Sequence, residues 1–259
     1  MKRRQLMRYA GAGLLTALGT GLASGFQTYQ AATPGGSVSV KWLGHTSFLF
    51  TGSGKRVLAN PFQKLGCTAG YRSSKVPADL VLVSSLLLDE GAVEGLPGNP
   101  QFLYKPGVYQ VDDLKIQGMS INHDRDGGRR FGTNVAWRWT QGGINILHLG
   151  GAAAPIDIEQ KILMGRPDVL LVPVGGSDKA YTPQEAMQAV KVLNPKLVIP
   201  THYRTQAADS ASCDIVSVDE FLALMEGTPV RRVNSDTLTI KSTDLPENGP
   251  AIAVMSYKF

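Results

Sequence analysis

The chain has 259 residues, of which 43% are apolar, and a formal net charge of +5. This length and composition can bury a large core in one domain or at most two. The positive charge is concentrated at the amino terminus, since the chain without its first 30 residues has 22 basic against 21 acidic groups. A body with charge so close to neutral excludes the electrostatic footprint of a nucleic-acid-binding protein.

Residues 1–30 have the composition of an export signal. They contain no acid, begin with basic residues and continue with an Ala/Gly/Leu segment over residues 9–23. The stretch RRQLMR at residues 3–8 resembles a twin-arginine signal, the label of proteins exported already folded. We therefore expect export to a periplasm, or to a thylakoid lumen if the source is photosynthetic. No clean A-x-A site follows, so membrane attachment through an uncleaved N-terminus is one alternative, and a cytoplasmic protein with a basic tail is another.

Residues 31–37, AATPGGS, have the composition of a linker, and we expect one domain over residues 38–259. The chain has two cysteines, Cys67 and Cys213, too few for a disulfide framework. A single bridge and two buried free thiols both remain open, because spacing in sequence does not show whether the two residues meet.

The first half of this domain is rich in short β-like runs. Strands are expected at residues 38–43, 47–51, 56–59, 81–84, 115–121, 134–140 and 144–149. Alternation of apolar and polar residues and tight turns such as QGG at 141–143 favour antiparallel pairs. The stretch DLVLVSSLLLDEGAVEG at 79–95 predicts a buried strand that runs into a helix, with Asp89 near the positive end of the helix dipole.

The second half alternates between strands and helices. Strands are expected at residues 168–174, 196–202, 237–242 and 251–257, and a helix at 217–225. Another helix is expected at 182–194, where Thr182 as N-cap, Pro183 at the first helical position and Glu185 form a capping box. Such a pattern is typical of an α/β (α+β) fold in which helices pack on two sheets.

Four histidines occur in the body of the chain, and each lies at or just past the end of a predicted strand: His45, His123, His148 and His202. Strand ends and the loops after them are where α/β proteins usually hold ligands, because the loops converge above a rigid sheet. These residues are therefore candidates for a functional site.

Six segments resemble the metallo-β-lactamase superfamily, in its branch of ascorbate-lactonase-like hydrolases, in order and spacing. They are KWLGHTSFLF (41–50), GKRVLANPF (54–62), GRRFGTNVAWRW (128–139), GGINILHLGG (142–151), DVLLVPVGG (168–176) and PKLVIPTHYRT (195–205). The resemblance covers about residues 38–206. It implies a four-layer αββα sandwich with a metal site at one edge of the two sheets.

The resemblance also implies a metal-binding H-x-H-x-D-H motif, which falls on residues 85–90. Four implied ligand positions have lost the ligand residue: Ser85, Leu87, Glu90 and, in place of a bridging aspartate, Gly151. Three positions keep it: Asp89, His123 and His202. We therefore expect that the dinuclear site is lost and that at most one ion binds. His45 and His148 match positions near the implied site that are not ligands, so packing or supporting roles are expected for them.

Three functional hypotheses follow. The main prediction is a noncatalytic binding or assembly protein, a pseudoenzyme without cofactor, because three leucines would close over the former site; its partner would be an unknown protein or a small molecule in the old cleft. The alternative is a mononuclear hydrolase, lactonase-, esterase- or phosphodiesterase-like, with zinc, manganese or iron on Asp89, Glu90, His202 and His123. The third is metal-free chemistry through Ser85 or His123, although Ser85 lacks a nucleophile-elbow motif.

The loop HDRDGGRRFG at residues 123–132 is dense in charge and glycine. We expect a solvated loop with internal ion pairs, and the alternative is a loop that binds an anion.

Overall fold

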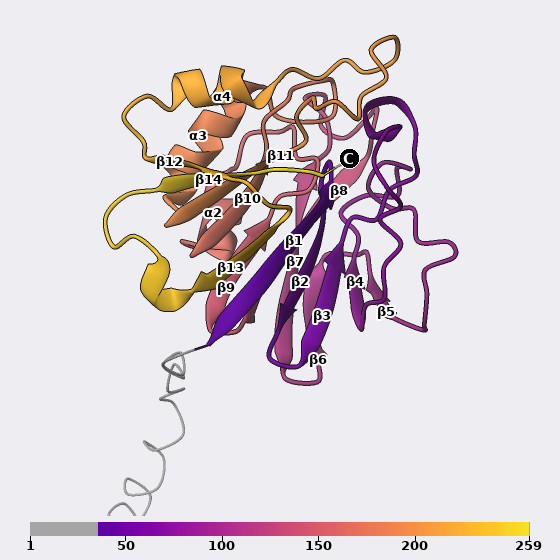
Figure 1. Ribbon diagram of the computed structural model, residues 1–259, viewed down its shortest axis with the longest axis vertical. Coiled ribbons are helices and arrows are strands. Elements are labelled where there is room, and N and C mark those ends of the chain that lie inside the picture. Colours follow the sequence, from indigo (N-terminus) through magenta and orange to yellow (C-terminus); the bar gives the residue numbers. More distant parts are fainter. Residues whose placement is uncertain (1–35, 259) are drawn as a thin grey trace, which may run out of the picture. The chain divides into compact units, whose positions relative to one another are not determined.

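Two β-sheets pack face to face in the structure, a computed structural model that describes residues 36–258 (Figure 1). The first sheet has the order β13-β1-β2-β3-β4-β5. Its strands are β1 (Ser37–Gly44), β2 (Ser47–Gly52), β3 (Lys55–Ala59), β4 (Leu80–Leu82), β5 (Gln101–Leu103) and β13 (Thr237–Lys241). The signal predicted at residues 1–30 and the linker up to residue 35 lie outside the described residues.

The second sheet has the order β12-β14-β11-β10-β9-β8-β7-β6. Its strands are β6 (Gly107–Val111), β7 (Leu114–Asn122), β8 (Thr133–Gln141), β9 (Ile144–His148), β10 (Val169–Pro173), β11 (Leu197–Thr201), β12 (Val230–Val233) and β14 (Ala251–Met255). The strands β9, β10 and β11 are parallel, whereas β6 to β9 form an antiparallel meander.

The main core lies between the sheets because alternate residues of their strands are apolar. On β1, Val38, Val40 and Trp42 are buried while the residues between them are more exposed. Phe50 on β2 meets Trp139 on β8 edge to face, with ring centroids 4.9 Å apart. Aromatic contacts of this kind add about 0.5–1.5 kcal/mol to the burial of the rings, so they help to hold the two sheets together.

Three helices cover the outer face of the second sheet: α2 (Ile158–Met164), α3 (Pro183–Leu193) and α4 (Val218–Leu224) (Figure 1). The predicted capping box of α3 is confirmed, since the Glu185 N–H donates to Thr182 Oγ1 at 3.2 Å and Glu185 Oε2 accepts from the Thr182 N–H at 2.8 Å. Short 3-10 helices occur at Gly66–Thr68 (η1) and Ser242–Asp244 (η2). No helix within residues 36–258 has both the length and the apolar character needed to cross a membrane.

The outer face of the first sheet is covered by irregular segments. A small cluster of Leu58, Val81 and Val83 packs there against Val76 and Leu96 from these segments. The predicted α/β sandwich with two mixed sheets is confirmed. The prediction of a helix that begins near Asp89 is wrong, because residues 85–90 form a turn. The N–H groups of Glu90 and Gly91 both donate to Leu87 O, and the Ala92 N–H donates to Pro61 O, which leads the chain out of the turn before a helix can propagate.

Strand direction brings several loops to one edge of the sandwich. In the first sheet β1, β3 and β4 run the same way, because β2 is antiparallel to both β1 and β3 and β4 is parallel to β3. In the second sheet the parallel β9, β10 and β11 likewise end at one edge. The turn after β1, the turn after β4 and the loops after β10 and β11 therefore supply the side chains of this edge.

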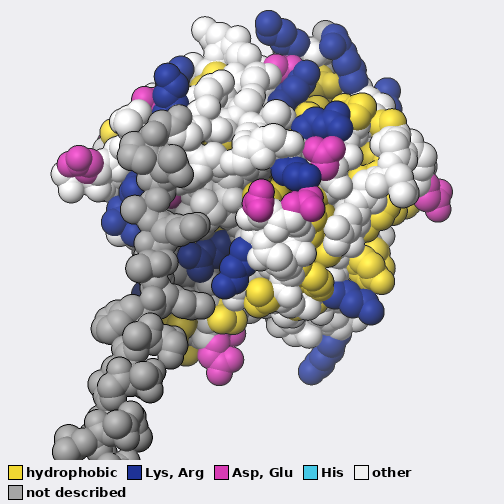
Figure 2. Space-filling view, turned by 90° about the horizontal axis from the view of Figure 1, so that it is seen from below, with side chains coloured by type: hydrophobic (Ala, Val, Ile, Leu, Met, Phe, Trp, Pro, Cys, Tyr) yellow, Lys and Arg dark blue, Asp and Glu magenta, His cyan; other side chains and the backbone are white. Residues whose placement is uncertain are grey.

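The opposite edge, where β1 begins, carries mixed charge. Among the described side chains in this view, Lys and Arg are interspersed with Asp and Glu, and apolar side chains lie between them (Figure 2). No continuous area of one sign covers this face, which agrees with the near-neutral charge of the body.

Candidate metal centre

Three side chains from distant parts of the chain converge between the sheets. His45 lies in the turn between β1 and β2, Asp89 in the turn after β4, and His202 directly after β11. One ligand atom from each residue lies within 4.8 Å of the others. Asp89 and His202 were predicted as candidate ligands, whereas His45 was expected only to pack or to support the site.

The two histidines are held in an unusual backbone conformation. His45 has φ 54° and His202 has φ 51°, in the left-handed region that residues with a Cβ rarely adopt. Such conformations cost about 1–3 kcal/mol each and cluster at functional sites. Surrounding contacts maintain them: Trp42 Nε1 donates to His45 O at 3.1 Å, and the His202 N–H donates to the same oxygen at 3.4 Å. The two imidazole rings lie with their centroids 4.2 Å apart.

The imidazoles have nitrogen atoms available for a ligand. Both residues are buried, and neither nitrogen of His45 nor Nδ1 of His202 has a hydrogen-bond partner in the structure. Burial lowers the pKa of His45 to about 4 and also lowers that of His202 well below its usual range. The rings are thus neutral near pH 7, the form that donates a nitrogen lone pair to a metal ion. Unpartnered buried donors and a nearby carboxylate fit a divalent cation.

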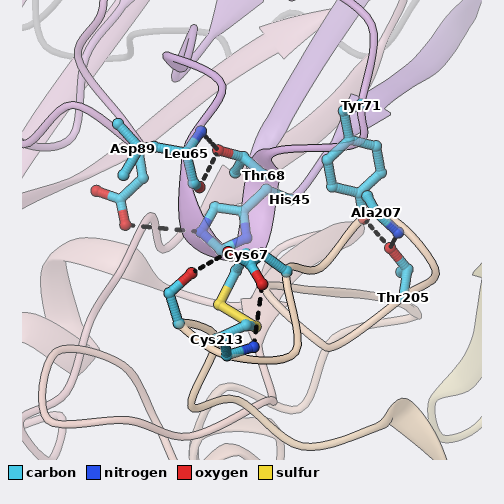
Figure 3. Close-up of a disulfide and its surroundings, with 12 residues drawn as sticks. His45, Leu65, Cys67, Thr68, Tyr71, Asp89, Thr205, Ala207 and Cys213 are labelled. Atoms are coloured by element: carbon cyan, nitrogen blue, oxygen red, sulfur yellow. Dashed lines mark hydrogen bonds and ion pairs between the residues drawn. A yellow bond between two sulfur atoms is a disulfide. The ribbon is translucent and has the colours of Figure 1, made fainter.

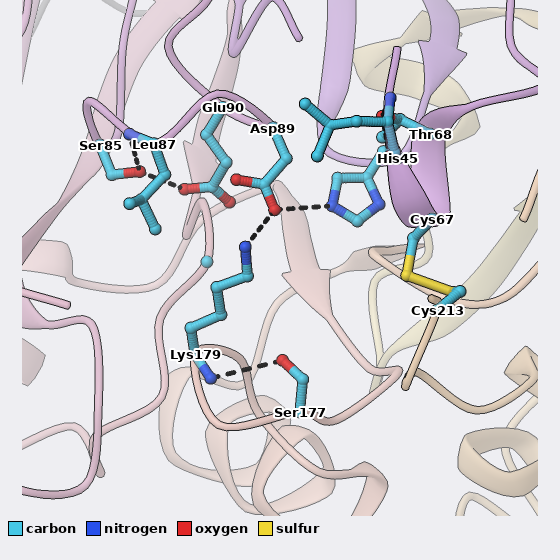
Figure 4. A network of polar contacts seen from close by, with 12 residues as sticks. His45, Cys67, Thr68, Ser85, Leu87, Asp89, Glu90, Ser177, Lys179 and Cys213 are labelled. Atoms are coloured by element: carbon cyan, nitrogen blue, oxygen red, sulfur yellow. Dashed lines mark hydrogen bonds and ion pairs between the residues drawn. A yellow bond between two sulfur atoms is a disulfide. The ribbon is translucent and has the colours of Figure 1, made fainter. Parts of the chain in front are cut away.

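Asp89 faces the Lys179 ammonium as well as His45 (Figure 4). Lys179 Nζ donates to Asp89 Oδ2, and His45 Nε2 lies 3.9 Å from the same oxygen. Burial alone would raise the pKa of the Asp89 carboxyl, but His45 and Lys179, with a smaller effect of His202, lower it to about 2. Asp89 is therefore an anion throughout the neutral range. Lys179 was not among the site residues predicted from the sequence. Its position in the loop after β10 is the feature that could have identified it, because such loops carry functional side chains.

A second cluster lies beside the first. Ser85 Oγ donates to Glu90 Oε2 at 3.0 Å, and His123 Nε2 lies 3.6 Å from that oxygen. All three side chains are buried. Burial, with the Asp89 charge, raises the pKa of Glu90 to about 8, so this carboxyl holds a proton near neutral pH. Burial lowers the pKa of His123 to about 4.

Gly151 explains why Glu90 fits there. A Cβ at residue 151 would lie 2.4 Å from His123 Nε2 and 2.6 Å from Glu90 Oε1. The Glu90 carboxyl thus occupies space next to the backbone at the position where the resemblance implies an aspartate. The structure brings Glu90, His123 and Ser85 together, and places Asp89 and His202 in the neighbouring donor set.

His148, Leu86 and Leu88 lie outside both clusters. His148 Nε2 lies 3.0 Å from Thr46 O, and its Nδ1 accepts from the Gly150 N–H at 3.0 Å, so neither nitrogen is free for a ligand. The prediction that all three leucines close over the site is wrong for Leu86 and Leu88. Leu86 is 75% exposed and Leu88 is 55% exposed, because the turn directs them to solvent.

Cys67 and Cys213 form a disulfide close to His45 (Figure 3). It joins two segments that also share hydrogen bonds, since the Asp209 N–H donates to Gly66 O at 3.0 Å and the Gly70 N–H donates to Ala207 O at 2.8 Å. The bridge therefore ties the segment after β3 to the segment that follows His202.

The charged loop at residues 123–132 is organised by one carboxylate. Asp124 accepts hydrogen bonds from the N–H groups of residues 126, 128, 130 and 131, at 2.8–2.9 Å. The expected internal ion pairs are not the ones observed. Arg125 pairs instead with Glu185 on α3, and Arg130 pairs with Asp178 on the loop after β10. The loop is thereby attached to the segment that carries Lys179.

Comparisons with known proteins agree with this geometry. The family model described as "Beta-lactamase superfamily domain" matches residues 39–202. A UPF0173 metal-dependent hydrolase of Thermococcus onnurineus is 31% identical over 193 residues, which is 65% of this chain and 85% of the relative. A UPF0173 metal-dependent hydrolase of Pelotomaculum thermopropionicum is 31% identical over 234 residues, which is 72% of this chain and the full length of the relative.

Solved structures show the same fold. The crystal structure of a proposed Zn-dependent hydrolase of the metallo-beta-lactamase superfamily from Thermotoga maritima superimposes with TM-score 0.65 and 28% identity, covering 84% of this chain and 98% of that one. A metallo hydrolase from Ignicoccus hospitalis superimposes with TM-score 0.55 at 19% identity, covering 79% and 99% of the two chains, a likeness of fold.

The prediction of a noncatalytic pseudoenzyme is therefore wrong. It rested on ligand positions lost from one motif, and it did not count His45, which completes a donor set with Asp89 and His202. The relatives named as metal-dependent hydrolases point the same way, and they make a divalent metal the expected cofactor. The chain belongs to the UPF0173 metal-dependent hydrolase family of the beta-lactamase superfamily.

Proposed function

We propose that the chain is a hydrolase that works with a single divalent ion held by His45, Asp89 and His202. The observation that carries this proposal is the approach of three ligand atoms within 4.8 Å, with both nitrogens of His45 and Nδ1 of His202 buried and without hydrogen-bond partners. A lone buried histidine is common in a core, but three unpartnered imidazole nitrogens around an ionised carboxylate are not, because each unpaired buried group costs free energy.

The donor chemistry suits zinc, manganese or iron. Two neutral imidazoles with one carboxylate form a set found in catalytic zinc sites and in non-haem iron sites. An ion at such a site acidifies water and polarises the bond to be hydrolysed. Of the chain's own groups, Asp89 provides the negative charge, and the neutral rings of His45 and His202 provide nitrogen donors.

Glu90 acts in this proposal as the general acid beside the metal centre, with His123 as its neutral neighbour. The raised pKa of Glu90 leaves a proton on its carboxyl near neutral pH, and the lowered pKa of His123, whose Nε2 lies 3.6 Å from Glu90 Oε2, makes that ring the weaker base, so the proton stays on Glu90 until the leaving group takes it. Ser85 orients this carboxyl by its hydrogen bond at 3.0 Å. Glu90 and His123 were both predicted from the sequence as candidate ligands. In this proposal they take part in general acid–base chemistry instead.

We also propose that the protein is exported. The basic, acid-free start of the chain supports this, and so does the Cys67–Cys213 disulfide, because such bridges persist mainly in oxidising compartments. Exported folded, the protein would carry its metal ion across the membrane already bound.

Metal analysis of the untagged full chain tests the proposed centre. We expect about one equivalent of zinc, manganese or iron in the wild type after dialysis and a clearly lower occupancy in His202→Ala and Asp89→Asn, since a three-donor site that loses one donor binds more weakly by about tenfold or more. Asp219→Asn, which alters an exposed carboxylate, is the matched control and should keep the metal. Equal occupancy in Asp89→Asn and wild type would overturn the proposal.

A further inference from the structure

We propose that Lys179 is the anion-binding residue of this site, a positive charge on a firmly held segment that binds an anionic oxygen of the substrate next to the metal. This inference rests on the proposed function. Lys179 Nζ donates to Asp89 Oδ2, and its side chain is 29% exposed, so it links the buried donor set to solvent (Figure 4). Lys179 and the proposed ion would therefore share one carboxylate as their partner.

The segment that carries Lys179 is held firmly from both sides. Gly175 packs so tightly that a Cβ there would lie 2.1 Å from His202 O. Arg125 Nη1 donates to Ser177 O at 3.0 Å and Arg125 Nη2 donates to Ala180 O at 3.0 Å. These bonds bracket Lys179 on both sides along the backbone.

Arg125 is itself fixed by a bidentate pair with Glu185, with Nε–Oε1 2.8 Å and Nη2–Oε2 2.6 Å. Bidentate pairs of this kind have defined geometry. Arg130 adds a second connection to the same segment through Asp178. The backbone of Lys179 is thus positioned, while the long side chain keeps its freedom to turn.

The ammonium and a divalent ion compete for Asp89. In the structure the ammonium neutralises this carboxylate, which is only 14% exposed and would otherwise be an unpaired buried charge. A divalent ion on Asp89 repels the ammonium at close range, since like charges a few ångströms apart cost free energy at low dielectric. The side chain then has to leave Asp89, but the backbone held by Arg125 keeps it near the donor set. A positive charge in that place attracts an anionic oxygen.

This arrangement selects the substrate class. A substrate with a phosphate or carboxylate oxygen adjacent to the bond to be hydrolysed satisfies Lys179, whereas a neutral substrate leaves the ammonium without a partner.

Two affinities measured on the full chain test the inference. Zinc affinity is measured by competition with a chromogenic chelator, and the binding of inorganic phosphate and of acetate to the zinc-loaded chain by calorimetry. In Lys179→Met we expect zinc to bind about tenfold more tightly, because the competing cation is gone, and the anion to bind about tenfold more weakly, each equivalent to about 1.4 kcal/mol. Lys179→Arg should keep anion binding, and Lys191→Met, at an exposed lysine of α3, should change neither affinity.

A merely structural role of Lys179 would not raise the zinc affinity while lowering the anion affinity, since misfolding of Lys179→Met would lower both. Phosphate binding preferred over acetate would indicate phosphoester substrates, and the reverse would indicate carboxylates. Zinc binding with unchanged anion affinity in Lys179→Met, or no anion binding by the wild type, would overturn this inference alone. A wild-type chain that binds no metal would overturn the proposed function and this inference with it.

Discussion

Lys179 and Asp89, 90 residues apart in the sequence, form an ion pair between the loop after β10 and the turn after β4. The pair joins the two sheets at the edge where His45 and His202 also lie. The Lys179 ammonium compensates the buried carboxylate, and in the proposed metal centre a bound cation would replace this contact. The stability of the metal-free protein and the proposed affinity for metal would then be coupled through one oxygen atom, Asp89 Oδ2.

The Asp89–Lys179 pair should show strong coupling in the metal-free protein. Lys179→Met leaves the buried carboxylate without its main partner, and we expect it to lower the free energy of unfolding by about 1–3 kcal/mol. The double variant Asp89→Asn/Lys179→Met should be more stable than the sum of the single effects predicts, by about 1 kcal/mol or more. Urea unfolding in the presence of chelator measures this. The exposed pair Asp219–Arg232 is the control, and its coupling should stay below about 1 kcal/mol; equal coupling in both pairs would contradict the prediction.

Gly151→Ala should disturb the Glu90–His123 cluster. The new methyl group would lie 2.4 Å from His123 Nε2 and 2.6 Å from Glu90 Oε1, so both side chains have to move. We expect a loss of about 1–3 kcal/mol in the free energy of unfolding, the usual cost of overpacking. Glu90→Ala removes one of the two clashing groups and should recover part of this loss. Strictly additive effects of the two substitutions in thermal or urea unfolding would show that the methyl group does not meet Glu90.

Loss of the disulfide should destabilise the protein without changing its fold. The bridge closes a sequence separation of 146 residues, for which loop-closure entropy predicts about 5 kcal/mol, while measured values are commonly about 2–5 kcal/mol. For a domain of this size this corresponds to a fall in Tm of about 10 °C. Calorimetry of Cys67→Ser/Cys213→Ser against the wild type, with and without reductant, measures the difference. Reductant should lower the Tm of the wild type only; an equal response of both proteins would contradict a native bridge.

Acid should weaken the loop at residues 123–132 through Asp124. The N–H groups of Phe131, Arg130, Gly128 and Asp126 hold the pKa of this carboxyl near 2, although burial opposes this. The folded pKa is lower than the unfolded value of about 3.9, so the stabilisation is complete above pH 4 and is lost as the pH falls from about 4 to about 2.

Asp124→Asn should therefore flatten the pH dependence of the urea midpoint between pH 4 and 2, besides lowering it at neutral pH. Asp126→Asn is the control in the same loop, because the Asp126 side chain is exposed and only its backbone N–H takes part in the network. An unchanged slope in Asp124→Asn would contradict the assignment of the acid-sensitive group.

Much of the fold follows from local patterns. The alternation in residues 38–43 and the capping box at Thr182 predict β1 and α3, and both are observed. The helix α2 was missed although Asp157 and Gln160 form a capping box at its start, because seven residues give too short a periodic signal. The edge strand β12 was missed because Arg231 and Arg232 interrupt its apolar pattern.

The sequence by itself determined that the chain builds two facing sheets, that strand ends carry its histidines, and that residues 85–90 depart from the superfamily's metal motif. Only the tertiary structure decided which of these residues meet. A donor set depends on which strands end at the same edge and on the direction in which each turn points its side chains. A shift of one residue in the register of a strand turns its side chains to the other face, and neither composition nor spacing in the sequence reveals such a shift. His45 meets Asp89 and His202 because β1 and β4 run in the same direction within one sheet and β11 ends opposite them. Lys179 meets Asp89 from a loop whose backbone is held by Arg125.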